Sequence, residues 1–112
     1  MDETDDYHNK LERLRKEIDN IDNEIVELLN KRGEIVIKVG RLKNELKLEI
    51  KQPIREKRLV ERIEAKSKNY NKKDIQAIWK EIIKASRKLQ NKVLKNNKDS
   101  SSDSKMKKSL KN

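Results

Sequence analysis

Apolar residues return at alternating steps of three and four over the first half of the chain. They are Leu11, Leu14, Ile18, Ile21, Ile25, Leu28, Ile35, Val39, Leu42 and Leu46. This spacing lines one face of a helix and predicts helix over about residues 9–48. At 1.5 Å per residue such a helix is roughly 60 Å long, whereas a compact domain of this size has a radius of gyration near 13 Å. Much of the stripe therefore stays uncovered within one chain, and the pattern predicts a homodimer.

Two shorter helices are predicted in the rest of the chain. Pro53 suits the first turn of a helix over about residues 53–68 and disfavours helix in the residue before it, so a connection falls within residues 44–52. Asn71 can cap a third helix, whose apolar positions continue to Leu94. Aromatic residues make up only 3% of the chain, with two glycines and one proline, which argues against a sheet. The expected fold is all-α, with three helices of which one is very long.

The two ends differ in composition from this helical part. Residues 1–8 carry four carboxylates, and residues 95–112 are rich in lysine, asparagine and serine without apolar periodicity. Both ends are expected to be mobile, which leaves residues 9–94 as a single folded domain within 112 residues. The basic end could contact nucleic acid, but a solvated terminus is the better explanation of this composition, and no specific role is assigned to it.

Polar residues interrupt the apolar face of all three predicted helices. Arg32 occupies a position where the stripe calls for leucine or isoleucine, Glu56 precedes the apolar positions of the second helix, and Ser86 and Gln90 lie on the stripe of the third. Each has a simple explanation by itself, since a polar core residue can fix the register of a coiled coil and a serine can bond to its own helix. Together they suggest a polar pocket, because a desolvated cation needs an anion and Glu56 alone is not enough.

Helical geometry indicates which cations can share that pocket. Arg32 and Lys43 are eleven residues apart, which places them within about 20° of one face and roughly 16 Å apart. Arg15 lies roughly 25 Å from Arg32 and about 100° around the helix, too far to reach the same small ligand. In an antiparallel dimer with its two-fold axis near residue 26, residue 15 of one chain would lie opposite about residue 37 of the other. The partner chain could therefore complete the pocket.

Composition narrows the kinds of site and partner. The chain has no cysteine, which excludes disulfides and thiolate chemistry and favours a cytosolic protein. No apolar stretch approaches the roughly 20 residues that span a bilayer, and the acidic start is unlike a signal peptide. His8 has no companion at ligand spacing, so no metal site is expected. The net charge of +10 favours an anionic partner, which could be nucleic acid, an acidic surface or a small polyanionic metabolite.

Five motifs occur in order along the chain: LRxxIDxID from Leu14, LLNxR ending at Arg32, VGxxK ending at Lys43, PxRE from Pro53, and SxxxQ from Ser86. In these motifs the chain resembles the all-helical chorismate mutases, over about residues 9–94. The resemblance implies an intertwined dimer of three-helix chains with a single enzymatic activity. It also implies that no cofactor or metal is needed.

The resemblance also implies roles for individual residues. Arg15 of the partner chain, Arg32 and Arg55 would bind the two carboxylates of the substrate chorismate. Lys43 and Gln90 would donate to its ether oxygen. The remaining contacts would come from Glu56 at the ring hydroxyl, from Ser86, and from Gln52, which stands where many family members have an acidic residue. These are the inward-facing groups found above, with Arg15, Arg55 and Gln52 added.

Two glycines, Gly33 and Gly40, lie inside the long predicted helix. Each costs about 1 kcal/mol of helix stability relative to alanine. They indicate close packing or room for a substrate, unless they are merely tolerated.

The leading functional hypothesis is a chorismate mutase of phenylalanine and tyrosine biosynthesis, which rearranges chorismate to prephenate. A lyase that removes pyruvate from isochorismate is an alternative on the same scaffold. A dimeric helical nucleic-acid binder is an alternative of another class, supported by the net charge and a sequence pI near 9.8. Mutation of Lys43 or Gln90 distinguishes these hypotheses. If the protein binds nucleic acid, such a mutation should change its stability only.

Overall fold

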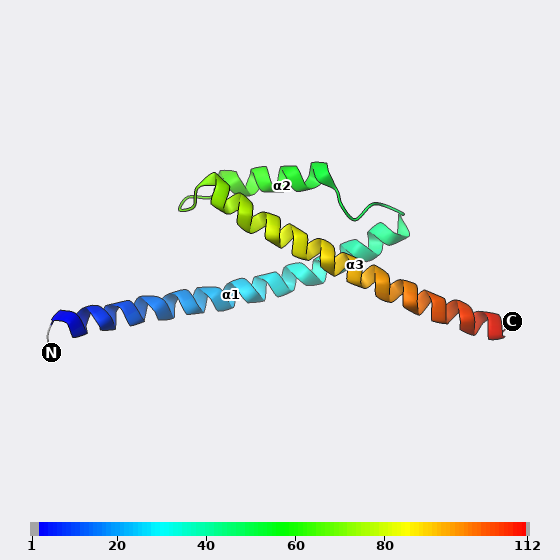
Figure 1. Cartoon of the computed structure of the whole chain (residues 1–112), viewed down its shortest axis with the longest axis horizontal. Coiled ribbons are helices and arrows are strands. Elements are labelled where there is room, and N and C mark those ends of the chain that lie inside the picture. Colours follow the sequence, from blue (N-terminus) through cyan, green and yellow to red (C-terminus); the bar gives the residue numbers. More distant parts are fainter. Residues whose placement is uncertain (1–2, 112) are drawn as a thin grey trace. The chain divides into compact units, whose positions relative to one another are not determined.

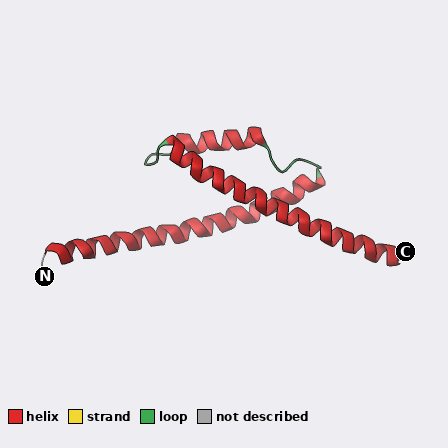
Figure 2. Ribbon diagram, viewed as in Figure 1, coloured by secondary structure: helices red, strands yellow, loops and turns green. Residues whose placement is uncertain are grey.

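The computed structural model describes the backbone of residues 3–111 and the side chains of residues 3–95. The described chain consists of three α-helices, α1 (Glu3–Glu45), α2 (Pro53–Lys66) and α3 (Lys72–Lys111), and contains no strand (Figures 1 and 2). The predicted all-α class with three helices, one of them very long, is confirmed. Two compact units divide the chain, one ending at Glu34 and the other beginning at Ile35.

The first unit is the part of α1 that precedes Ile35. Acidic residues occupy its first turn, where their negative charges interact favourably with the positive end of the helix dipole. Its apolar stripe is exposed in the single chain, with Leu14, Ile18 and Ile21 each more than half exposed. The ion pairs along its surface are also exposed and contribute little to stability. This stripe is the surface that the predicted dimer would cover.

The second unit begins with the last turns of α1, which end in a Schellman motif. Leu48 N–H donates to the carbonyl of Lys43 at 2.8 Å, and Lys47 N–H donates to that of Asn44 at 3.2 Å. Lys47 adopts the left-handed conformation, with φ of 56°, which this motif requires and which usually favours glycine. The helix therefore ends at Glu45, slightly earlier than the apolar pattern predicts, and the chain turns back toward Lys43.

Helices α2 and α3 pack against each other and form the core of the second unit (Figure 1). Leu59 of α2 and Ile75 and Ile83 of α3 are its buried apolar residues. Pro53 occupies the first turn of α2, as predicted. The predicted cap of α3 is also present, since Asp74 N–H donates to Asn71 Oδ1 at 2.8 Å.

Both outer helices are longer than the sequence pattern predicts. Helix α1 starts at Glu3 instead of about residue 9, and α3 continues to Lys111, well beyond Leu94. The side chains of residues 96–112, which make up most of the basic end, lie outside the described residues. Mobility of the two ends stays a prediction. Within the described chain, no helix has the length and apolar content needed to cross a membrane.

Candidate active site

The second unit brings Lys43 and Gln90 into direct contact. Lys43 lies in the last turn of α1, and its Nζ donates to Gln90 Oε1 at 3.0 Å and to the carbonyl of Ile50 at 2.7 Å. The turn after α1 carries Ile50 back toward this ammonium. Two of the three protons of the ammonium are thus engaged by the protein, which fixes its orientation and leaves one for another acceptor.

Gly40 explains how Gln90 comes so close. Both residues are buried, and Gln90 is only 6% exposed. A Cβ atom at position 40 would lie 3.0 Å from Gln90 Cγ and 3.3 Å from its Cα. The absence of a side chain at Gly40 therefore permits α1 and α3 to approach at this point, one turn before Lys43. The predicted role of this glycine in close packing is confirmed.

Glu56 lies in the first turn of α2 and is held from two sides. Its Oε2 accepts a hydrogen bond from Gln52 N–H at 3.3 Å, and its Oε1 lies 3.4 Å from Arg87 Nη2 of α3. The Glu56 side chain is 20% exposed and that of Arg87 33% exposed. The carboxylate is therefore partly shielded from water and paired with a cation.

The environment of Lys43 changes its acidity. Burial lowers the pKa of Lys43 below its ordinary value, and the negative charge of Glu56 opposes this effect by favouring the ammonium form. Glu56 thus acts on Lys43 electrostatically, although the two belong to different helices. The arrangement is a carboxylate between two cations, Lys43 and Arg87.

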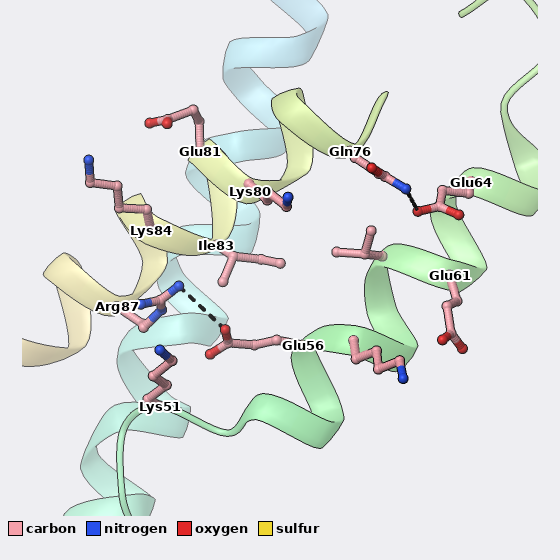
Figure 3. Close-up of a pocket in the computed structure, with 12 residues that line it drawn as sticks. Lys51, Glu56, Glu61, Glu64, Gln76, Lys80, Glu81, Ile83, Lys84 and Arg87 are labelled. Atoms are coloured by element: carbon pink, nitrogen blue, oxygen red, sulfur yellow. Dashed lines mark hydrogen bonds and ion pairs between the residues drawn. The ribbon is translucent and has the colours of Figure 1, made fainter. Parts of the chain in front are cut away.

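An open cavity of about 750 Å³ lies between α2 and α3 beside this cluster (Figure 3). Glu56 and Arg87 line it and reach toward each other from the two helices, and Ile83 gives it an apolar surface. Lys43 and Gln90 do not line the cavity, so Glu56 is the group common to both places. The volume is within the range of small-molecule sites.

Two predicted site residues make local contacts in the chain. The side-chain amide of Gln52 donates to the carbonyl of Glu49 at 2.7 Å, so Gln52 supports Glu56 through its backbone N–H only. The hydroxyl of Ser86 donates to the carbonyl of Ile82 at 2.8 Å. This is the hydrogen bond to its own helix by which a serine is tolerated on a helix face.

The three predicted arginines are distributed over the two units. Arg15 and Arg32 belong to the first unit, where Arg15 donates to Glu12 Oε1 at 2.8 Å and is exposed, while Arg32 is half-buried. Arg55 is exposed in the first turn of α2. The cluster in the second unit thus consists of Lys43, Gln90 and Glu56, with the backbone of Gln52.

Arg87 is the member of this cluster that sequence reasoning missed. It lies four residues after Ile83 and three before Gln90, a spacing that places all three on one face of α3. The same rule that identified Gln90 could therefore have identified Arg87. No group of three or more metal-ligating side chains occurs among the residues described.

Comparison with known proteins identifies the family. Residues 14–91 match the family model described as Chorismate mutase type II, and the chain belongs to this family. All the site residues considered above, from Arg15 to Gln90, fall within the match. The crystal structure of chorismate mutase from Helicobacter pylori in complex with prephenate has a similar fold, with a TM-score of 0.72 and 38% identity. That similarity covers 78% of this chain and 96% of the other.

Two curated relatives are similar in sequence. A bifunctional chorismate mutase/prephenate dehydratase from Aquifex aeolicus is 36% identical over 89 residues, which cover 75% of this chain and 25% of the relative. A chorismate mutase from Methanocaldococcus jannaschii is 40% identical over 62 residues, 55% of this chain and 63% of the relative. The matches thus span about a quarter and somewhat less than two thirds of these proteins.

Proposed function

We propose that the protein is a chorismate mutase that catalyses the intramolecular Claisen rearrangement of chorismate to prephenate. The observation that carries the proposal is the contact between Lys43 and Gln90, because it places an oriented ammonium and an amide together in a chain of this family. The rearrangement has one substrate and requires no nucleophile, and we assign no cofactor or metal to it.

Lys43 and Gln90 supply the electrostatic part of catalysis. As the carbon–oxygen bond of the substrate breaks, negative charge grows on its ether oxygen. The remaining proton of Lys43 and the amide hydrogens of Gln90 donate to this oxygen. Because their orientation is fixed before the reaction, these donors stabilise the transition state more than the substrate.

The lowered pKa of Lys43 agrees with this role. Burial weakens the hydration of the ammonium and so strengthens its interaction with an anionic oxygen. Glu56 favours the charged form that the reaction needs, and its carboxylate accepts the ring hydroxyl of the substrate. The carboxylate of Glu56 thus keeps Lys43 charged and also orients the ring of the substrate.

Positioning of the substrate is assigned to arginines and to a second copy of the chain. Arg32, Arg55 and Arg15 of the partner chain bind the two carboxylates, since a guanidinium binds a carboxylate in a bidentate manner. Ser86 adds a polar contact. The exposed apolar stripe of α1 supports the homodimer, because burial of Leu14, Ile18 and Ile21 requires a partner surface. Antiparallel intertwining stays part of this proposal.

The biological setting follows from the same assignment. We place the enzyme in phenylalanine and tyrosine biosynthesis, since one relative is named as a chorismate mutase that also carries a prephenate dehydratase. A cytosolic location stays a prediction from the sequence.

The test is the loss of chorismate, followed by ultraviolet absorbance with the purified chain and with the product identified. We expect prephenate as the product. Lys43→Ala and Gln90→Ala should each lower kcat by about a hundredfold or more, in keeping with the loss of one fixed donor. Lys88→Ala, which removes an exposed lysine from α3, serves as the matched control.

Two results would contradict the proposal. Pyruvate released from isochorismate, with no turnover of chorismate, would indicate the lyase. Salt-sensitive binding of nucleic acid without turnover of either compound would indicate the binding protein. Activity that survives both Lys43→Ala and Gln90→Ala would overturn the assignment of the site.

A further inference from the structure

Of the two nitrogen atoms Nη2 and Nε of Arg87, only Nη2 has a partner within the described protein. Its Nη2 lies 3.4 Å from Glu56 Oε1, whereas its Nε is buried and has no hydrogen-bond partner among the described residues. Nε and Nη2 can form one edge of the guanidinium, from which two parallel hydrogen bonds are normally donated. A buried donor without an acceptor is costly, and a small turn of the side chain into the cavity would bring this atom to an acceptor on a ligand.

The place of Arg87 indicates which ligand atom it meets. Arg87 and Glu56 point toward each other in the cavity between α2 and α3, and Ile83 lies beside them (Figure 3). A hydroxyl has one proton to donate and lone pairs that accept. A carboxylate paired with a guanidinium matches both functions, since Glu56 accepts the proton while Arg87 donates to the oxygen.

We propose that Arg87 is a specificity-determining residue that donates from Nε to the oxygen of the substrate's ring hydroxyl, while its Nη2 holds Glu56. This inference rests on the proposed function and extends it to a residue outside the set found from the sequence. It also explains how Glu56 is oriented without an acid at position 52. The amide of Gln52 donates to Glu49, and the second contact to the carboxylate comes from α3 instead.

A comparison of two substrates tests the proposal. Chorismate and an analogue that lacks only the ring hydroxyl are assayed with the wild-type chain, Arg87→Met, Arg87→Lys and the exposed control Lys88→Met. Arg87→Met should lower kcat/KM for chorismate by about ten- to a hundredfold, the usual effect of losing a hydrogen bond to a charged group. For the analogue, wild type and Arg87→Met should be equal within about twofold, because the hydroxyl that Arg87 contacts is absent.

Arg87→Lys keeps the charge but not the planar edge with two donors, so an intermediate loss on chorismate is expected. The melting temperature and helicity of every variant are measured in parallel. Arg87→Lys also provides the test if Arg87→Met fails to fold.

Each other outcome overturns the inference. An equal loss on both substrates would mean that Arg87 only supports the fold, and no loss on chorismate would mean that it has no role in binding. If the folded wild-type chain converts neither compound, the proposed function fails and the role of Arg87 fails with it. That result differs from an active wild type with an unaffected variant.

Discussion

Replacement of Gly40 by alanine tests whether close packing at this residue holds Gln90 in place. In an exposed helix the change would stabilise the chain by about 1 kcal/mol, because alanine forms helix better than glycine. Here the new methyl carbon would lie 3.0 Å from Gln90 Cγ and 3.2 Å from its Cβ. Since favourable carbon contacts begin near 3.5 Å, these atoms must move by about 0.5 Å. Overpacking of this kind costs roughly 1–3 kcal/mol, so we expect a net loss of up to about 2 kcal/mol.

The same displacement should reach the chemistry through one hydrogen bond. Gln90 Oε1 accepts from Lys43 at 3.0 Å, so a shift of Gln90 misplaces both donors of the site. A misplacement of 1 Å can cost about a hundredfold in rate, and half of that distance should cost about tenfold in kcat. Urea denaturation measures the free energy of unfolding, and the absorbance assay with chorismate measures kcat and KM.

A double-mutant cycle isolates the contact. Gln90→Ala removes Cγ, the atom nearest to the new methyl group, so Gly40→Ala should be less destabilising in that background than in the wild type. If Gly40→Ala instead stabilises the wild-type chain by about 1 kcal/mol and leaves kcat unchanged, the packing at this residue is loose. Gly40 would then not be needed to hold Gln90 in place.

Three further predictions concern charge, the turn after α1 and assembly. Burial lowers the pKa of Lys43 below its ordinary value of 10.5, so its ammonium is lost as the pH rises through the lowered pKa. Turnover of chorismate should therefore decline at an alkaline pH that lies below 10.5. Glu56→Gln should move the decline to still lower pH in a kcat profile. Lys47→Gly should stabilise the chain by roughly 0.5–1 kcal/mol in urea denaturation, because it relieves a left-handed lysine; a lower stability would contradict this. Ile21→Asp should convert a dimer to a monomer in sedimentation and abolish turnover, whereas Asn20→Asp, off the stripe, should do neither.

The helices were predictable because their signals are local. The spacing of the apolar residues identified α1, Pro53 marked the start of α2, and Asn71 capped α3 as expected. The end of α1 was less predictable, since the Schellman motif contains Lys47 where a glycine would have been the sign. The end of α3 was placed from apolar periodicity, which stops at Leu94, whereas the helix does not.

The site was predictable where a polar residue replaced an apolar one on an inner face. Gln90 was identified in this way and contacts Lys43, as a shared site requires. Arg87 was missed because a long cationic side chain beside a stripe is normally assigned to solvent, and its partner Glu56 is on another helix. Spacing also says nothing about local side-chain bonds, such as that from Gln52 to Glu49.

The turn that follows α1 has a consequence for redesign of the chain. It makes two hydrogen bonds with Lys43. Leu48 N–H donates to the backbone carbonyl of Lys43, and the ammonium of Lys43 donates to the carbonyl of Ile50. A circular permutant opened between Leu46 and Leu48 would separate Lys43 from both contacts and leave its side chain free to rotate. Opening the chain between α2 and α3 would preserve them. The first connection therefore helps to hold the proposed site, whereas the second connection is the better place for new chain termini.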